Sequence, residues 1–224
     1  IVADAPISDK WDVYSVIFDG VDEYVDTNSV DDTQASKSYS FWAKSTETGP
    51  NGIFDHGSHQ RGAFEFNDNA ERPMLYMGTG GKYRYWAATS SQSDGAWHHW
   101  VLYISPTDME DCKLYCDGVV QTTNATSNAG VYYTYQDIRI GYGGLGMFNG
   151  NLDEFAIFDG ELTSAQINTI FNGGVPADLS SLSPDAWWRM GDGDYYPTLK
   201  DSSGNDYDGT MTNMESSDIR ADTP

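Results

Sequence analysis

Short runs of alternating apolar and polar residues recur along most of the chain, separated by clusters of Gly, Asn, Asp and Ser. Alternation over four to eight residues is the pattern of a strand with one buried face. Many short strands at this spacing predict two antiparallel sheets packed face to face. The runs that we assign to strands are residues 14–18, 38–43, 52–55, 63–66, 74–77, 83–86, 97–104, 113–116, 119–120, 137–141 and 152–158.

Only one segment, residues 162–171, has a convincing helical pattern. Thr163 is placed to cap its first turn, and Gln166 stands three residues further on, as a capping box requires. Apolar residues then recur at helical spacing until two glycines, at 173 and 174, end the pattern. We expect one short helix that packs at an edge of the sandwich.

The sequence changes character after Pro176. Residues 177–184 are rich in Ser and are typical of a linker, and residues 186–190 form a further strand-like run. The loop 201–209 is dense in oxygen-bearing side chains. We therefore divide the chain into a main sandwich over residues 1–176, a linker over 177–184 and a strand-and-loop segment over 185–224.

Composition narrows the classes of partner. The 224 residues include 34 acidic and 12 basic residues, for a net charge of −22, which argues against nucleic acid or an anionic membrane as a partner. No apolar run approaches the roughly 18 residues of a membrane span. Of the acidic residues 26 are Asp and 8 are Glu, and Asp in loops suits turns and cations such as Ca²⁺.

The two cysteines predict neither a disulfide nor a zinc site. Cys112 and Cys116 would lie roughly 13 Å apart along one strand, which is too far for a disulfide. Two thiols alone are too few ligands for zinc. The following Asp117-Gly118 pair indicates a tight hairpin. Because the chain begins at Ile1 without Met, we expect a processed product.

The ordered set of motifs resembles the laminin-G-like modules of the concanavalin A-like lectin/glucanase superfamily. The resemblance covers most of the chain and implies a curved antiparallel jelly roll with one short helix. No single motif carries it alone. The matching stretches are residues 18–25 (FDGVDEYV), 41–42 (FW), 97–101 (WHHWV), 114–118 (LYCDG), 140–141 (IG), 148–155 (FNGNLDEF) and the helix at 162–171.

Residues 185–224 depart from the family order. The Trp187-Trp188-Arg189 run, with the loop that follows it, is similar to the opening of such a module, yet here it comes last. The pattern I-x-A-D-x-P also occurs at both ends of the chain, at residues 1–6 and 219–224. Either residues 185–224 complete their own sandwich, or they add strands to a neighbouring copy and build head-to-tail polymers.

The resemblance also implies calcium. In many members of the superfamily Ca²⁺ braces the sandwich, held by carboxylate and carbonyl oxygens. Asp19 and Asp153 match acidic positions of the family. If their strands are neighbours, both carboxylates would converge with the Gly20 carbonyl and Asp22, and Asn151 would add an amide oxygen. The alternative is that Asp19 caps a turn and Asp153 pairs with an arginine. The loop from Asp201 to Asp208 is a second, weaker candidate, since such loops also form plain Asx turns.

Sugar binding is the usual function of the superfamily, through aromatic side chains stacked on pyranose rings. Alternation along a strand places Tyr83 and Tyr85 on one face, and Tyr133 and Tyr135 likewise share a face. These four tyrosines are our candidate ligand-binding residues. The alternative is that they fill the core or an interface between subunits.

Catalysis is not expected. The E-x-D-x-E pattern of laminarinase-type hydrolases is absent, and Glu65 and Asp68 have the wrong spacing to replace it. There is also no G-x-S-x-G motif. His98 and His99 lie in a run similar to a family motif, where we expect structural roles.

Three functions remain open from the sequence. The first is a non-catalytic, calcium-braced adhesion or carbohydrate-binding module at the surface of a virion fibre or another extracellular assembly. Its partners would be a glycan or cell-surface polysaccharide and other copies of the chain, without insertion into a membrane. The second is a structural subunit that assembles by strand addition, and the third is a glycan-degrading enzyme.

Overall fold

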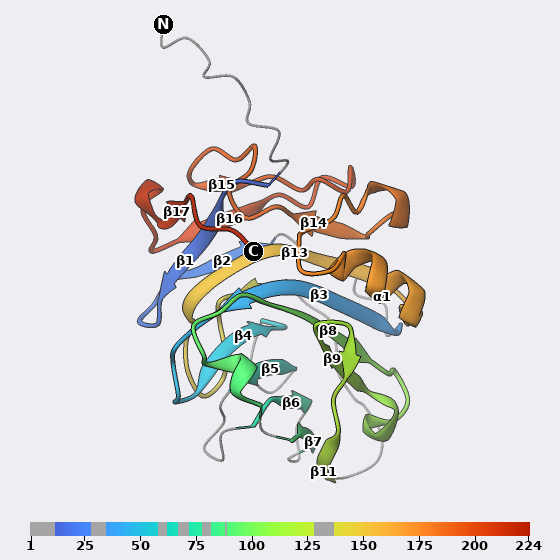
Figure 1. The fold of residues 1–224 in the computed structure, drawn as a ribbon. Coiled ribbons are helices and arrows are strands. Elements are labelled where there is room, and N and C mark those ends of the chain that lie inside the picture. Colours follow the sequence, from blue (N-terminus) through green and yellow to red (C-terminus); the bar gives the residue numbers. More distant parts are fainter. Residues whose placement is uncertain are drawn as a thin grey trace, which may run out of the picture.

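Two antiparallel sheets lie face to face in the computed structural model, which describes residues 12–27, 35–57, 62–66, 72–77, 82–87, 89–127 and 137–224 (Figure 1). The predicted all-β sandwich is thereby confirmed. Sheet A contains, in spatial order, β10 (Val119–Val120), β9 (Lys113–Cys116), β8 (His98–Ile104), β3 (Lys37–Lys44), β13 (Asn149–Asp159), β1 (Ser15–Asp19) and β17 (Ile219–Arg220), with β14 (Ala186–Trp188) paired to β13. Sheet B contains β11 (Thr123–Ser127), β7 (Lys82–Trp86), β6 (Met74–Met77), β5 (Ala63–Phe66), β4 (Asn51–Asp55), β12 (Arg139–Ile140), β2 (Tyr24–Thr27), β16 (Gly209–Thr212) and β15 (Thr198–Leu199).

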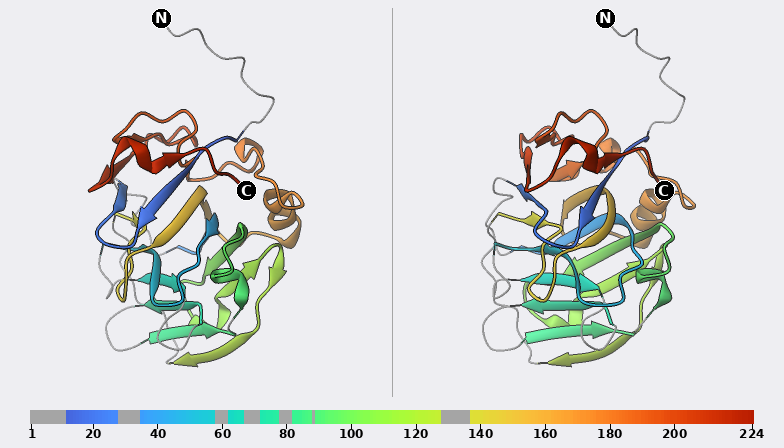
Figure 2. Two further views of the ribbon diagram at one scale, coloured as in Figure 1. Left: turned by 60° about the vertical axis from the view of Figure 1, so that its left-hand side comes forward. Right: turned by 90° about the vertical axis from the view of Figure 1, so that its left-hand side faces the viewer.

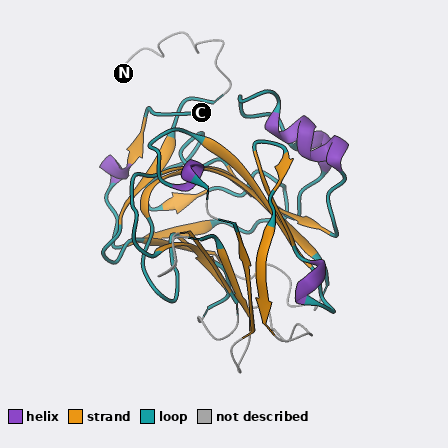
Figure 3. Cartoon of the chain, turned by 60° about the horizontal axis from the view of Figure 1, so that its bottom comes forward, coloured by secondary structure: helices purple, strands orange, loops and turns teal. Residues whose placement is uncertain are grey.

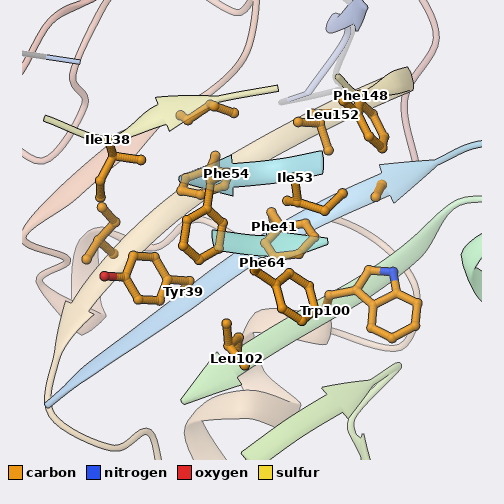
Figure 4. Packing of buried hydrophobic residues seen from close by; sticks show 14 of the residues in the cluster. Tyr39, Phe41, Ile53, Phe54, Phe64, Trp100, Leu102, Ile138, Phe148 and Leu152 are labelled. Atoms are coloured by element: carbon orange, nitrogen blue, oxygen red, sulfur yellow. The ribbon is translucent and has the colours of Figure 1, made fainter. Parts of the chain in front are cut away.

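Aromatic side chains dominate the core between the sheets (Figure 4). Phe41 of β3 stacks on Phe155 of β13 with ring centroids 5.6 Å apart, and Phe54 of β4 meets Phe155 edge-on at 5.8 Å. Full burial of one such side chain stabilises the fold by about 1.5–3 kcal/mol. The alternation seen in the sequence is therefore the signature of this shared apolar layer.

Sheet A is buried on both faces, because a second apolar cluster covers its outer side. In β3 every residue but the last is buried: Tyr39 and Phe41 face the core, while the neighbouring Ser40 and Trp42 face outward. The outer cluster contains Val101, Ala156, Phe158, Leu162, Ile167, Ile170, Leu179 and Trp187. A strand covered on both sides loses its clean apolar–polar alternation.

The single helix, α1 (Ser164–Phe171), supplies part of that cover. Thr163 caps it, and the reciprocal hydrogen bonds with Gln166 form the predicted capping box. Ile167 and Ile170 face sheet A, so the helix packs on the outer face and not at the edge that we expected. Figure 3 shows this helix outside the layers of strands. Four short 3-10 turns complete the described elements: η1 (Ser90–Gln92), η2 (Met109–Asp111), η3 (Ser180–Leu182) and η4 (Ser216–Asp218).

The β9–β10 hairpin forms where the Asp117-Gly118 pair predicts it. Cys116 pairs with Val119, so the turn has two residues. Asp117 has φ +49° and Gly118 has φ +77°, and two consecutive positive φ angles are what a tight I′ turn requires. This turn fixes the position of the Asp117 carboxylate beside the start of β8.

Residues 185–224 pack against the sandwich of their own chain. β14 pairs with β13, β16 pairs with β2, and β17 pairs with β1. Figure 2 shows this orange-to-red segment lying along the blue strands. The preceding stretch, residues 177–184, contains η3 and buries Leu179 in the outer cluster, so it is also packed against the sandwich.

Candidate functional site

The five residues expected to bind calcium do not come together. β1 and β13 are neighbours, as the expectation requires, but Asp19 pairs with Asn149. Asp153 lies four residues further along β13, roughly 13 Å away at strand spacing. Asp22 lies in the turn that follows β1, where its carbonyl accepts the Asn213 amide at 3.0 Å. These positions rule out one shared ion site.

The alternative role for Asp19 fits the structure better. Its Oδ1 accepts the backbone N–H of Val21 at 2.7 Å, which closes an Asx turn around Gly20. The Asn151 side chain is also hydrogen-bonded to another residue, since its Nδ2 donates to the Ser15 hydroxyl at 3.2 Å. These contacts make the FDG turn a structural feature of the β1–β2 connection.

A β-bulge in β13 places Asp153 and Glu154 in a different environment. The pairing of β13 with β3 shifts register between Asp153 and Ala156, and Glu154 has φ +49°. A bulge re-aims the side chains at one point of a strand. Leu152 and Phe155 on either side face the core, while both acidic side chains between them are buried.

Asp12 joins these two residues in a buried acidic cluster. One carboxylate oxygen from each of Asp12, Asp153 and Glu154 lies within 4.8 Å of the others. Both Asp12 oxygens and Oδ2 of Asp153 are buried without a hydrogen-bond donor among the described residues. Buried carboxylates that face each other without donors are costly unless a proton or a cation lies between them.

Because of this burial and repulsion, the pKa values of all three carboxyl groups are raised. Burial raises the pKa of Asp12 to about 8, with contributions from the facing Asp192 and from Glu154. Burial also raises the pKa of Glu154 to about 7, against the opposing pull of Arg189. The pKa of Asp153 is raised well above its usual value by burial and by Asp12 and Glu154.

Four hydrogen bonds hold Glu154 and the neighbouring Asp192 in place. Trp187 Nε1 donates to Glu154 Oε2 at 2.5 Å, and Arg189 Nε donates to Oε1 at 3.3 Å. Asp192 Oδ2 accepts the backbone N–H groups of Val13 and Tyr14 at 3.0 and 3.1 Å. Glu154 is thus paired, whereas Asp12 and Oδ2 of Asp153 have no donor among the described residues. Carboxylate oxygens are the ligands that Ca²⁺ prefers, so the residues suited to that ion are Asp12, Asp153 and Glu154. The arginine expected beside Asp153 instead meets its neighbour, Glu154.

The loop from Asp201 to Asp208 is an ordinary network of turns. The Asp201 carboxylate accepts the N–H of Trp187 at 3.0 Å, of Ser203 at 2.9 Å and of Tyr207 at 3.1 Å. Asp208 Oδ1 accepts the N–H of Asp201 at 2.9 Å. The Asx-turn alternative therefore describes this loop.

The predicted tyrosine pair lies on the outer face of sheet B. In β7 the side chains of Arg84 and Trp86 are buried, while Tyr83 and Tyr85 are half-buried on the opposite side. Their ring centroids are 4.8 Å apart, and the rings are tilted by 59°. Tyr76 lies on the neighbouring strand β6 directly opposite Tyr83 and therefore shares this face. Tyr133 and Tyr135 lie outside the described residues.

Cationic side chains cover two aromatic rings on sheet B. The Arg72 guanidinium lies 3.9 Å from the centroid of the Tyr85 ring, and that of Arg139 lies 3.6 Å from the Tyr142 ring. Arg139 is held by two hydrogen bonds to the buried Asp55, at 2.8 and 2.5 Å. Flat rings beside fixed hydrogen-bonding groups are what a sugar ring needs for recognition.

The two facing antiparallel sheets define a jelly-roll sandwich. A family model described as the concanavalin A-like lectin/glucanases superfamily, of the laminin G type, matches residues 19–168. The chain therefore belongs to this superfamily, as the sequence motifs predicted. No curated protein has a sequence that matches this chain significantly.

Solved structures share the fold at low sequence identity. A candidate carbohydrate-binding protein from Bacteroides ovatus has a TM-score of 0.65 and 15% identity, over 93% of this chain and 60% of the other. A SAP-like pentraxin from Limulus polyphemus has a TM-score of 0.53 and 15% identity, over 71% and 82%. The binding domain of botulinum neurotoxin serotype D has a TM-score of 0.52 and 16% identity, over 72% and 43%. The chain thus spans 60% of the Bacteroides protein.

Sequence reasoning missed several residues that the fold brings together. Asp12 and Asp192 are 180 positions apart, yet both belong to the surroundings of Asp153. Arg72 precedes β6 in a stretch that we left unassigned. No local pattern marks these residues. The proximity of Asp12 and Asp192 to Asp153 depends on the pairing of β14 with β13 and on the bulge at Glu154, and that of Arg72 to Tyr85 depends on the pairing of β6 with β7. Among the described residues, no helix is long and apolar enough to cross a membrane.

Proposed function

We propose that this chain is a non-catalytic carbohydrate-binding module that uses the outer face of sheet B and is braced by calcium. The observation that carries the proposal is the pair Tyr83 and Tyr85, with ring centroids 4.8 Å apart and Arg72 over the second ring. The candidate carbohydrate-binding relative from Bacteroides ovatus and the fold of the neurotoxin binding domain support a binding role.

The physical basis is contact between flat surfaces. The apolar face of a pyranose ring packs on an aromatic ring, while its hydroxyl groups bind polar neighbours. Arg72 lies over one face of the Tyr85 ring and supplies hydrogen-bond donors there, and Tyr76 of β6 extends the aromatic surface next to Tyr83. Because the chain carries a net charge of −22, we expect neutral glycans to bind better than sulfated or uronate-rich ones.

The calcium brace would occupy the cluster of Asp12, Asp153 and Glu154. A divalent cation there would neutralise the facing carboxylates and supply a partner for Asp12 and for Oδ2 of Asp153, which have no donor among the described residues. It would also connect β13 to the segment before β1, since Asp12 and Asp153 belong to these two parts of the chain. We therefore propose a structural role for calcium, away from the tyrosine face.

An enzymatic role receives less support. Hydrolysis of a glycosidic bond requires two carboxyl groups about 5–10 Å apart on either side of a bound sugar. The acidic cluster of Asp12, Asp153 and Glu154 is buried, and Trp187 and Arg189 of the C-terminal segment contact it. These acids do not border the half-buried tyrosines, which belong to the other sheet.

Assembly by exchange of residues 185–224 is also less favoured, because these residues fill positions in their own sheets. Sheet A still ends in β10, whose Val119 and Val120 are exposed at 62% and 57%. Self-association would therefore use such an edge. A location outside the cell or on a virion surface stays a prediction.

Glycan binding tests the proposal. The wild-type chain and the variants Tyr83→Ala, Tyr85→Ala and Tyr195→Ala would be compared on a glycan array and by calorimetry with the best neutral ligand. We expect each β7 substitution to weaken binding roughly 3- to 10-fold, by about 0.5–1.5 kcal/mol. Tyr195 is 81% exposed in a distant loop, so its substitution should leave binding unchanged. The absence of wild-type binding across the array would contradict the proposal.

Calcium is tested separately by melting. We expect Ca²⁺ to raise the melting temperature of chelator-treated protein, and Asp153→Asn to abolish that rise. Asp19→Asn serves as the matched control, because Asp19 lies in the Asx turn outside the cluster. An unchanged melting temperature after chelation and after addition of Ca²⁺ would overturn the brace and leave the glycan proposal standing.

A further inference from the structure

A second group of metal-ligating side chains lies at the rim of sheet A, on different elements from the acidic cluster. It consists of His98 at the start of β8, Cys116 at the end of β9 and Asp117 in the β9–β10 turn. One ligand atom from each of the three lies within 4.8 Å of the others. This combination of nitrogen, sulfur and oxygen donors differs in chemistry from the all-carboxylate cluster.

The backbone holds these three side chains in place. Asp117 Oδ1 accepts the N–H of His99 at 2.9 Å, and the Asp117 N–H donates to the His99 carbonyl at 2.8 Å. These bonds, together with the positive φ of Asp117, fix its second carboxylate oxygen toward His98. Oδ2 then lies 2.6 Å from His98 Nδ1. The site is thus organised by β8 and the hairpin without an added ligand.

The other ring nitrogen of His98 also has a carboxylate partner. Nε2 lies 3.2 Å from Oδ2 of Asp94, in the loop before β8. A metal-bound histidine nearly always donates its remaining N–H to such a carboxylate, which fixes the tautomer and strengthens the metal bond. Asp94 therefore stands where an outer partner of a metal-bound His98 would stand.

We propose that His98, Cys116 and Asp117 bind a borderline-soft divalent metal ion, Zn²⁺ being the natural fit, with Asp94 as the outer partner of His98. The ion would bind Nδ1 of His98, Sγ of Cys116 and Oδ2 of Asp117. It would take the place of the Nδ1 proton in the His98–Asp117 hydrogen bond, and the neutral ring would then carry its one proton on Nε2, which donates to Asp94. The thiol proton would leave to solvent at the same time, since a thiolate is the form that binds zinc.

The distances suit this ion after small movements. Zinc bonds of 2.0–2.3 Å place tetrahedral ligand atoms roughly 3.5 Å apart. The His98–Asp117 contact at 2.6 Å would open by about 0.9 Å. The thiol, within 4.8 Å, would close by at most about 1.3 Å. Cys116 is a free thiol at 6% exposure, next to partly exposed His98 and Asp117. A water molecule from the open side would complete four ligands.

Cobalt absorption provides the test, because Co²⁺ replaces Zn²⁺ and reports a bound thiolate directly. The full chain would be titrated with Co²⁺ under reducing conditions, with saturating Ca²⁺ present to occupy the acidic cluster. We expect a near-ultraviolet thiolate-to-cobalt band that Zn²⁺ removes by competition. No such band in the wild-type chain would overturn the proposal.

Matched variants locate the ligands. Cys116→Val should lose the band, while Cys112→Val, which removes the other buried thiol, should keep it. His98→Gln and Asp94→Asn should weaken Co²⁺ binding by at least tenfold. A band that survives Cys116→Val, or that disappears in Cys112→Val, would contradict the assignment.

X-ray absorption on the zinc-loaded wild-type chain gives a result that does not depend on the folding of any variant. We expect one sulfur ligand among nitrogen and oxygen ligands. A shell of oxygen and nitrogen alone would overturn the proposal, and it would leave the calcium and glycan proposals untouched.

Discussion

The indole N–H of Trp187 donates a 2.5 Å hydrogen bond to Oε2 of Glu154, 33 residues earlier in the chain. This bond joins β14, in the C-terminal segment, to the bulge of β13. Trp187 is only 3% exposed, and its ring belongs to the apolar cluster on the outer face of sheet A. The same side chain therefore covers the sheet and holds one member of the acidic cluster.

Replacement of this indole should weaken the attachment of the C-terminal segment. Trp187→Phe retains an aromatic ring but leaves the buried Oε2 of Glu154 without its donor. A lost hydrogen bond to a buried charged group costs about 1–3 kcal/mol, which denaturant unfolding would measure. Trp97→Phe is the control, because its indole bonds the more exposed Asp222 at 3.2 Å, and we expect a smaller loss. Equal losses in both variants would contradict the role given to Glu154.

The acidic cluster should make the calcium-free protein less stable as pH rises. Folding raises the pKa of Asp12 to about 8 and that of Glu154 to about 7, and it raises the pKa of Asp153 well above its usual value. The folded state therefore binds more protons than the unfolded state between about pH 4 and 8. The contribution of this cluster to stability is therefore fully present below about pH 4 and is lost as pH rises through these pKa values.

Asp153→Asn tests this dependence in chelator. The variant removes one facing charge, so its free energy of unfolding at pH 8 should exceed that of the wild-type chain by roughly 1–3 kcal/mol. The difference should shrink toward pH 5, where protons neutralise the cluster. Parallel pH profiles for the two proteins would show that the cluster does not titrate as inferred.

His56 should act in the opposite direction at acid pH. Its ring is fully buried, stacks on Phe54 and lies 3.2 Å from the Tyr39 hydroxyl, and burial lowers its pKa to about 3. The unfolded chain takes up the proton first, near pH 6.5. The contribution of His56 to stability is therefore fully present above pH 6.5 and is lost as pH falls toward 3.

We expect the free energy of unfolding to fall by about 2–3 kcal/mol between pH 6.5 and pH 4 because of His56. His56→Gln should remove this part of the acid sensitivity, at some cost in stability at neutral pH. Tyr39→Phe removes the hydrogen bond but keeps the imidazole, so its acid sensitivity should remain. Denaturant unfolding at several pH values measures the acid sensitivity of both variants. If the unfolding free energy of His56→Gln falls with acid pH as steeply as that of the wild-type chain, His56 is not the cause.

The sequence predicted correctly those features that depend on a few adjacent residues, namely the helix start and the tight turn. Thr163 and Gln166 mark the start of α1, and Asp117-Gly118 marks the β9–β10 turn, because capping and turn geometry depend on a few adjacent residues. β11, over Thr123–Ser127, was missed. Its sequence TNATS carries no apolar alternation, and its strand form depends on pairing with β7.

The sites were harder to predict than the fold, since each depends on contacts between distant segments. Alternation alone placed Tyr83 and Tyr85 on one face, and the structure agrees. The family resemblance implied that Asp19 and Asp153 meet, which the register of β1 with β13 prevents. The bulge at Glu154, which turns Asp153 toward Asp12, has no sequence signature of its own.

The loop after β12 should depend on the absence of a side chain at Gly52. A Cβ at Gly52 would lie 2.3 Å from the backbone N and Cα of Gly143 and 2.4 Å from the Gly146 carbonyl oxygen. Backbone cannot yield as a flexible side chain can, so Gly52→Ala would displace this loop from β4. It would also disturb the hydrogen bond from Leu145 N–H to the buried Glu65 at 2.9 Å. We expect a loss of at least about 2–3 kcal/mol in unfolding free energy.

Gly49→Ala, three residues earlier, provides the control. A Cβ at Gly49 would meet only the Glu47 carboxyl, at 3.1 Å, and that end of a side chain can move. We therefore expect a change within about 0.5 kcal/mol for Gly49→Ala. Because the displaced loop also carries Tyr142, which lies under Arg139, Gly52→Ala should weaken glycan binding if the ligand extends to that ring. Binding that is unaffected in a folded Gly52→Ala protein would confine the ligand to the Tyr83–Tyr85 end of sheet B.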